Sequence, residues 1–238
     1  MTTRFRLPLG RGLFFLCAFL FALIALLPLR LALDWFGLGE RGFAARQANG
    51  SVWLGTVQEA QFGRVALGDL GTSLNILPLL VGTARIEVQG LEGRRLKGAF
   101  TSTRRGFGVD DVEAQVAMAG AFGPLPLAGL DLDDLSVRFE GGQCRSVEGR
   151  VKATLGGDFG GVPLPALAGV ARCEGGLLLL PLTSQAGSER LLLRIGADGR
   201  YRAELSVRPS QPAVAAALTA AGFAAAGGGY TLRLTGEL

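Results

Sequence analysis

The sequence predicts a mainly β protein: an N-terminal transmembrane helix, then a strongly curved antiparallel β-sheet, forming an open trough or partly closed barrel, with one short helix near the C-terminus. Three observations predict this class. Apolar and polar residues alternate with period two from Ser51 onward, which is typical of half-buried strands. The 37 glycines suit tight turns and curved strands. The spacing typical of parallel βαβ units is absent.

An uncharged apolar run at 12–29, GLFFLCAFLFALIALLPL, predicts the transmembrane helix, which we place at 12–33. Its 18 residues rise about 27 Å, close to the roughly 30 Å hydrocarbon core of a bilayer. The alternative is a cleaved signal peptide, but the sequence that follows, LALDW at 31–35, offers no Ala-x-Ala cleavage site. The predicted anchor residues are Arg11, Leu13, Phe14, Phe15, Leu16, Phe19, Phe21, Ile24, Leu27 and Trp35.

The charges before this run predict its orientation. Arg4, Arg6 and Arg11 precede it, so the positive-inside rule places residues 1–11 in the cytoplasm and 34–238, as one β domain, across the membrane. Trp35 and Phe36 fit an interfacial aromatic anchor.

The net charge of +4 gives no basis for nucleic-acid binding. Without the three N-terminal arginines, the 24 basic residues become 21, against 20 acidic ones. The remaining arginines alternate with apolar neighbours, as on solvated strand faces, and form no basic patch.

Two of the three cysteines are expected to pair. Cys17 lies in the apolar run, which leaves Cys144 and Cys173 on the exported side, where thiols oxidise. We expect a disulfide between them, closing a loop of about 30 residues. The alternative is two buried free thiols.

Strands are predicted where the alternation is regular: 83–89, 111–118, 135–140, 147–155, 191–195, 201–207 and a last strand at 230–238. Asp198-Gly199 predicts a hairpin with a type I′ turn, and Asn49-Gly50 a second one. Pro at the start, an alanine-rich body and a closing Gly predict a short helix over 212–222.

The apolar sides of these strands define a candidate inner face. If it forms a closed core, no room remains for a ligand; if it lines an open trough, a lipid could bind. The residues assigned to this face are Val112, Val116, Leu135, Val137, Val151, Leu193 and Leu205.

No constellation in the sequence predicts catalysis, a metal or a cofactor. The chain has no histidine, which removes the usual general base and histidine metal ligands. Asp131, Asp133 and Asp134 lack the glycine and glutamate of an EF-hand, so we interpret them as a solvated turn. Asp110 and Asp111 are expected at an exposed strand start. The glycine clusters do not match phosphate-binding loops.

Several motifs, taken in order, resemble those of type II secretion system protein N. They are GSVWLG at 50–55, LNILPLLVG at 74–82, Cys144 followed by GRV at 149–151, CEGGLLLLPL at 173–182, the hairpin DGRY at 198–201, LTAAGF at 218–223, and GGYTLRLTG at 228–236. One departure is Leu74, where the family pattern would have Trp. The family-motif residues are Gly50, Trp53, Gly55, Pro78, Leu79, Leu80 and Gly82.

This resemblance implies a bitopic inner-membrane protein of Gram-negative bacteria with a periplasmic β domain. The family is an accessory part of the machine that exports folded proteins through an outer-membrane secretin, and it is not catalytic. The implied partners are other inner-membrane or periplasmic components of that machine, bound by an exposed strand edge or surface.

A shorter similarity offers an alternative. The Pro-Leu-Leu-x-Gly element between two strands also resembles AsmA/TamB-type proteins, whose sheets hold lipid in a groove. This implies a periplasmic lipid-binding or lipid-transport protein, and it depends on an open apolar face.

Overall fold

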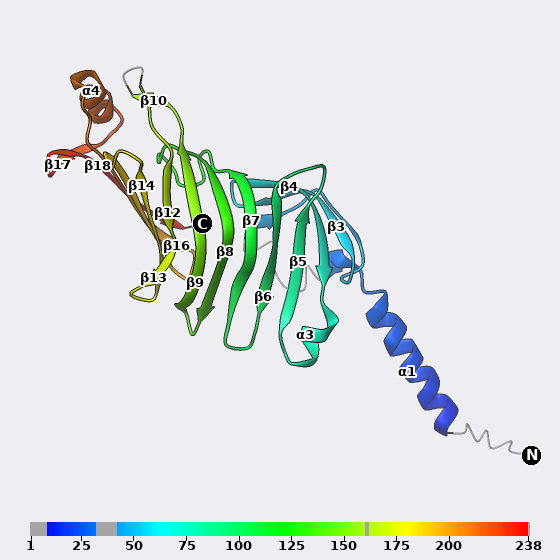
Figure 1. The fold of residues 1–238 in the computed structure, drawn as a ribbon. Helices are drawn as coiled ribbons and strands as arrows, with labels where there is room; N and C mark the ends of the chain where they lie inside the picture. The colour runs from blue at the N-terminus through cyan, green and yellow to red at the C-terminus, as the bar shows by residue number, and fades with distance from the viewer. Residues whose placement is uncertain (1–8, 32–41, 160–161, 238) are drawn as a thin grey trace, which may run out of the picture.

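The computed structural model describes residues 9–31, 42–159 and 162–237 (Figure 1). Within these residues, sixteen strands form one antiparallel sheet and two more form a separate hairpin. The sheet is not closed, because its outermost strands, β1 (Phe43–Ala44) and β17 (Ala224–Ala226), do not pair with each other. The predicted mainly β class with one large antiparallel sheet is confirmed.

The first part of the sheet is a meander in which each strand from β3 to β9 pairs with the next one in sequence. The patterns predicted at 83–89, 111–118, 135–140 and 147–155 lie in β5, β7, β8 and β9. The elements after α1 (Leu9–Ala25) and β1 are β2 (Gln47–Gly50), β3 (Gly55–Phe62), β4 (Val65–Leu74), α3 (Ile76–Leu80), β5 (Ala84–Gly90), β6 (Leu96–Ser102), β7 (Gly106–Ala117), β8 (Leu127–Glu140) and β9 (Gln143–Leu155).

The second part continues the sheet in the order β9, β12, β14, β15, β16, β18, β17, with β13 paired to β14. The predicted short helix is α4, which begins at Pro212, and the predicted last strand is β18. The elements are β10 (Asp158–Phe159) and β11 (Val162–Pro163), which form the separate hairpin, β12 (Leu167–Val170), β13 (Arg172–Glu174), β14 (Leu177–Ser184), β15 (Glu189–Ile195), β16 (Arg200–Val207), α4 (Pro212–Ala220), β17 and β18 (Gly229–Glu237).

The connections between strands alternate between two ends of the sheet, because neighbouring strands are antiparallel. We call one end proximal; it holds the connections at 51–54, 75–83, 103–105 and 141–142. The distal end holds those at 63–64, 91–95 and 118–126. Figure 1 shows α1 leaving the sheet near α3, at the proximal end, and α4 at the far side of the molecule.

The apolar N-terminal run differs from the continuous helix predicted over 12–33. Helix α1 ends at Ala25, Pro28 forms a β-bridge with Ser51, and residues 29–31 are helical again. The break follows from Pro28, which lacks an N–H and disfavours helical backbone in the preceding residue. In the part of the chain that the structure describes, no helix has both the length and the hydropathy of a membrane span. Arg4, Arg6, Trp35, Phe36 and the side chain of Arg11 lie outside it.

The sheet bends round on itself in its second half. The rings of Phe122, between β7 and β8, and Tyr201 of β16 lie 4.9 Å apart edge to face. Four strands separate β8 from β16, so a flat sheet would hold these elements about 24 Å apart. The bend encloses a large core between β8 and β18, which α4 covers with Val214 and Leu218.

Most of the candidate inner face lies in this large core. Leu135, Val137, Val151, Leu193 and Leu205 are all buried, with at most 7% of their surface exposed. Val112 packs against them. Val116 is only partly buried and lies outside this cluster, although its register partner Leu130 belongs to it. At the buried positions the apolar face is a closed core.

Both predicted Gly turns differ in detail. Asp198-Gly199 lies in a hairpin, but the loop has three residues, closed by a hydrogen bond from Gly196 N to Arg200 O, with Gly199 at φ +80°. Only the glycine takes positive φ there, so the turn is not type I′. Asn49 and Gly50 belong to strand β2, and the turn follows at 51–54.

Candidate functional site

The GSVWLG motif forms a joint between α1 and the sheet. The last carbonyls of a helix have no partner within the helix. Here the indole Nε1 of Trp53 donates to the carbonyl oxygen of Ile24 at 3.0 Å, and the Val52 N–H donates to that of Leu27 at 3.0 Å. The Ile24 carbonyl also accepts the Leu27 N–H at 3.3 Å, so the connection between β2 and β3 adds hydrogen bonds at and just after the C-terminal end of the apolar helix.

Leu29 is the apolar part of this joint. Its side chain is 7% exposed and lies in a second, smaller core with Val57, Ala60 and Leu70 of β3 and β4. A Cβ on Gly55 would lie 2.6 Å from Leu29 Cδ2, so only glycine leaves room for that side chain. Leu29 thus fixes the segment after α1 to the sheet.

Gly50 is required for a different reason. Its φ of +88° is a conformation that L residues rarely adopt, and a Cβ there would lie 2.6 Å from the carbonyl oxygen of Leu54. Gly50 and Gly55 are register partners across the β2–β3 hairpin. The two motif glycines and Trp53 therefore build one structure, which we call the anchor joint.

The Pro-Leu-Leu-x-Gly motif forms α3 at the same end of the sheet. Pro78 lies in the first turn, where a missing N–H breaks no helical hydrogen bond. Gly82 ends the turn with φ +77°, and its N–H donates to the carbonyl of Leu79 at 3.0 Å. Leu80 points to solvent with 79% of its surface exposed.

The predicted anchor residues lie along α1 and the turn after it. In the described part of the chain those of α1 are each more than half exposed, while Leu27 is partly buried. The exposed ones are Leu13, Phe14, Phe15, Leu16, Phe19, Phe21 and Ile24.

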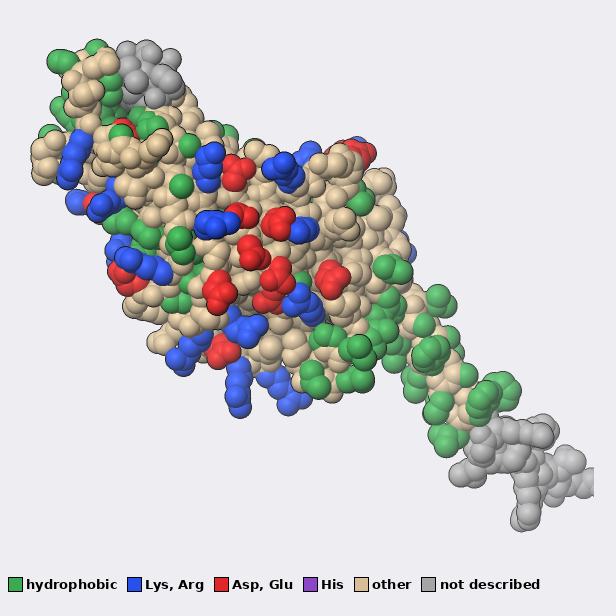
Figure 2. All heavy atoms as spheres, viewed as in Figure 1, with side chains coloured by type: hydrophobic (Ala, Val, Ile, Leu, Met, Phe, Trp, Pro, Cys, Tyr) green, Lys and Arg blue, Asp and Glu red, His purple; other side chains and the backbone are tan. Residues whose placement is uncertain are grey.

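A groove of about 820 Å³, lined by charged, polar and apolar residues, runs across β3 to β8. Figure 2 shows acidic and basic side chains interspersed over the face turned to the viewer. Asp110 is one of the residues lining the groove: it accepts hydrogen bonds from Thr101 Oγ1 at 2.6 Å and Arg85 at 2.8 Å, and lies 3.5 Å from Arg138.

The predicted positions of the aspartates in a turn and at a strand start are wrong, although Asp111, Asp133 and Asp134 are exposed as expected. Asp110 and Asp111 lie within β7, and Asp131, Asp133 and Asp134 lie within β8. The physical reason is a pair of β-bulges, at Asp111 and Asp134, whose positive φ angles of 53° and 54° bend the strands without ending them. The Asp110 side chain is only 17% exposed.

Two cations beside the groove have raised pKa values. The hydrogen bond and charge of Glu113 raise the pKa of Lys97, and those of Asp133 raise the pKa of Arg150. Lys97 and Arg150 therefore keep their charges at neutral pH. Among the described residues, no group of three or more His, Cys, Asp or Glu is placed to hold a metal ion.

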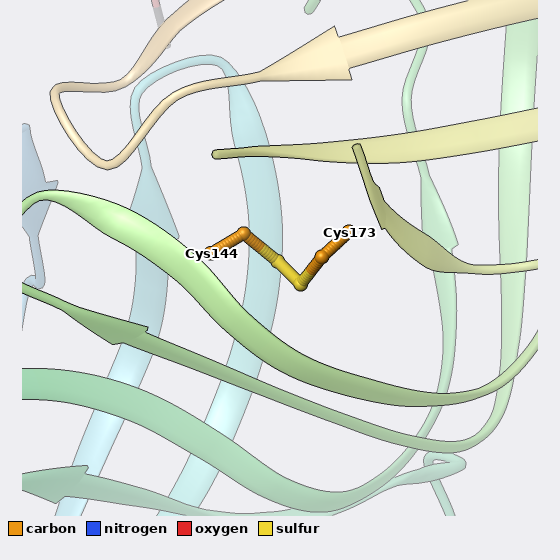
Figure 3. The surroundings of a disulfide bond; sticks show 2 residues. All are labelled: Cys144 and Cys173. Atoms are coloured by element: carbon orange, nitrogen blue, oxygen red, sulfur yellow. A yellow bond between two sulfur atoms is a disulfide. The ribbon is translucent and has the colours of Figure 1, made fainter. Parts of the chain in front are cut away.

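Cys144 and Cys173 form a disulfide between the start of β9 and β13 (Figure 3). Their Cα atoms are 5.5 Å apart, and the Cys144 N–H also donates to the carbonyl of Gly176 at 2.8 Å. The bond ties β13, which pairs only with β14 within the sheet, back to β9.

Sequence reasoning missed Leu29 and the Asp110 cluster as parts of a site. Leu29 is hidden in a continuous apolar run, where Pro28 is the only signal of a break. Arg85, Thr101 and Asp110 each follow an apolar residue, but the contact among them depends on strand register, with Arg85 opposite Thr101.

Comparison with known proteins identifies the family. A model of the family described as type II secretion system (T2SS), protein N, matches residues 41–233. The type II secretion system protein N of Vibrio cholerae serotype O1 is 26% identical over 217 residues, covering 84% of this chain and 85% of that protein. No solved structure matches. The resemblance of the motifs is confirmed, and the chain belongs to the type II secretion system protein N family, a component of the type II secretion system.

Proposed function

We propose that this chain is a non-catalytic, inner-membrane component of the type II secretion system that assists export of folded periplasmic proteins through the outer-membrane secretin. Its N-terminus is cytoplasmic, α1 and the residues after it anchor it in the membrane, and the sheet lies in the periplasm. Its partners are other inner-membrane or periplasmic components of the machine, not nucleic acid. The family membership supports this role.

The observation that carries the proposal is the anchor joint. An apolar helix with exposed Leu and Phe side chains leaves the sheet at one end, and the hydrogen bonds of Trp53 and Val52 fix its last turn to the sheet. Apolar side chains in this number are stable when lipid surrounds them. The joint then holds the sheet at a set position beside the membrane.

The free edge of β18 is the surface we assign to partner binding. β17 pairs only with Gly229, Tyr230 and Thr231, so the outer side of residues 232–237 has no strand partner among the described residues. Such an edge can accept a strand from another protein through backbone hydrogen bonds.

Site-specific photo-crosslinking in cells tests this role. A photoreactive residue at Thr235, exposed on β18, should link to another secretion component, and the adduct should vanish in a strain lacking that component. A matched probe at Lys152, exposed on the central strand β9, should not. Equal adducts at both positions would refute the edge as the binding surface. Secretion unaffected by deleting the chain would refute the proposed role.

A lipid-binding role is the second candidate, and one observation favours it. Phe100 and Phe107 are each 40% exposed and stack 6.5 Å apart, and Phe107 stacks on Phe139 at 5.4 Å. An acyl chain could lie along these rings on β6 to β8. Native mass spectrometry of the gently extracted protein tests it: bound lipid would support this role, and bound secretion components alone would support the first.

A further inference from the structure

Helix α3 and the residue after it present an apolar surface to solvent. Ile76 is 58% exposed, and Leu77, Leu80 and Val81 are each 79–80% exposed. We call these four residues the α3 patch. The helix contributes no buried residue to either core, and these four side chains are the most exposed apolar ones of the helix and of the residue after it. Exposed clusters of large apolar side chains commonly mark interaction surfaces.

The patch lies beside the anchor joint. Antiparallel pairing places the β4–β5 connection, which contains α3, at the same end as the β2–β3 connection, which holds the joint. Because β3, β4 and β5 are adjacent and strands lie about 4.8 Å apart, α3 is within two strand spacings of the joint. In Figure 1, α3 projects from the sheet near the C-terminal end of α1, and Figure 2 shows the hydrophobic side chains of both regions on that side.

The part of the proximal end nearest α3 has a charge that fits an anionic surface. The connections at 51–54, 75–83, 103–105 and 141–142 contain no Asp or Glu. Arg104 and Arg105, in the β6–β7 connection, and Arg145, at the start of β9, are exposed and form no ion pair among the described residues. Acidic lipid headgroups attract such residues.

We propose that the α3 patch inserts into the interface of the same bilayer that α1 enters, as a second membrane contact, with Arg104 and Arg105 against the headgroups. The inference rests on the proposed anchoring by α1. A short apolar segment needs only to reach the headgroup and acyl boundary, not to span the membrane. The anchor joint and the α3 patch lie on either side of β4. Together they would fix the tilt of the sheet relative to the membrane, which a single helix leaves free.

Fluorescence in vesicles tests this contact with the full chain. The environment-sensitive probe NBD is attached to single cysteines in a Cys17→Ser background, at Leu80→Cys or Leu77→Cys, and at Val170→Cys as the control. Val170 is 61% exposed on β12, where it pairs with Arg150 in the interior of β9, several strands from α3. Cys144 and Cys173 do not react while bonded. The probe on native Cys17, in α1, reports the anchor itself.

The proteins are reconstituted in phosphatidylethanolamine–phosphatidylglycerol vesicles with a doxyl-labelled lipid that quenches only nearby probes. We expect a blue shift and a loss of fluorescence at positions 77 and 80 comparable with that at 17, and neither at 170. Quenching at 17 without quenching at 77 and 80 would overturn the second contact, assign the patch to a protein partner and leave the anchor intact. No quenching at 17 would refute the anchor as well.

Discussion

The indole nitrogen of Trp53 donates a hydrogen bond to the carbonyl oxygen of Ile24 across 29 residues of sequence, at 3.0 Å. A motif in a strand connection thereby caps a helix that lies outside the sheet. Because Leu29 is buried in the same place, the direction of α1 is set by the sheet. The joint can be tested one contact at a time.

Trp53→Phe should loosen the joint without unfolding the sheet. Phenylalanine keeps an aromatic ring but has no donor for Ile24, a loss of about 0.5 to 1.5 kcal/mol. We expect faster hydrogen exchange at the Val52 amide, and unchanged exchange at Leu193 in the large core. Slow exchange at Val52 in the variant would contradict a joint held by this bond.

Gly55→Ala should displace Leu29 from the small core. The new Cβ would lie 2.6 Å from Leu29 Cδ2 and 3.0 Å from the carbonyl oxygen of Ser51. Overpacking of this kind costs about 1 to 3 kcal/mol. The measurement is the free energy of unfolding in urea, with Gly71→Ala as the control, because its Cβ would meet atoms no closer than 3.6 Å. Equal losses in both variants would show that Leu29 does not decide the effect.

The regular strands could be predicted from sequence because their periodicity follows from burial of one face. Val137 and Leu193, each followed by an arginine, belong to the apolar sides of their strands and lie in the core as expected. β-bulges interrupt this periodicity. At Asp111 and Asp134 the strand continues through a residue of positive φ, so the local sequence pattern resembles a strand end or a turn.

The joint and the Asp110 cluster could not be predicted because they depend on contacts between distant residues. Trp53 was recognisable as a family-motif residue, but its partner is a backbone carbonyl, which has no sequence signal. Leu29 lies in the same apolar run as the exposed residues of α1, and only the folded structure shows that it is buried.

Removal of the disulfide should destabilise the β domain. A loop of 29 residues predicts a loss of about 3 to 4 kcal/mol in the chain-entropy account. Cys173→Ser should therefore lower the free energy of unfolding by that amount, and Cys17→Ser, outside the sheet, should not change it. Free alkylation of Cys144 in the oxidised, folded protein would contradict the bond.

Asp110→Asn should be costly, unlike the same change at an exposed aspartate. The carboxylate accepts from Thr101 and Arg85 while 17% exposed, and loss of its charge weakens bonds worth about 1.5 to 3 kcal/mol each when a partner is charged. Asp134→Asn is the control: it is exposed, asparagine tolerates positive φ, and we expect a change within about 0.5 kcal/mol.

Thermal unfolding of both variants gives the comparison. A neutral Asp110→Asn would mean that the cluster does not stabilise the sheet. Lost secretion by Asp110→Asn at normal stability and abundance would instead assign the groove a role in binding or chemistry.

A charge in the large core should abolish folding of the part of the sheet from β8 to β18. Val137 is 5% and Leu193 1% exposed, and a carboxylate buried there without a partner costs several kcal/mol, comparable with the whole stability of a domain. Val137→Asp and Leu193→Asp should therefore reduce cellular abundance and secretion together. The control is Val170→Asp, which introduces the same charge at a side chain 61% exposed, so abundance and secretion should stay normal. Normal abundance of both core variants would mean that this face is open to water and could hold a lipid, and the closed core would then be wrong.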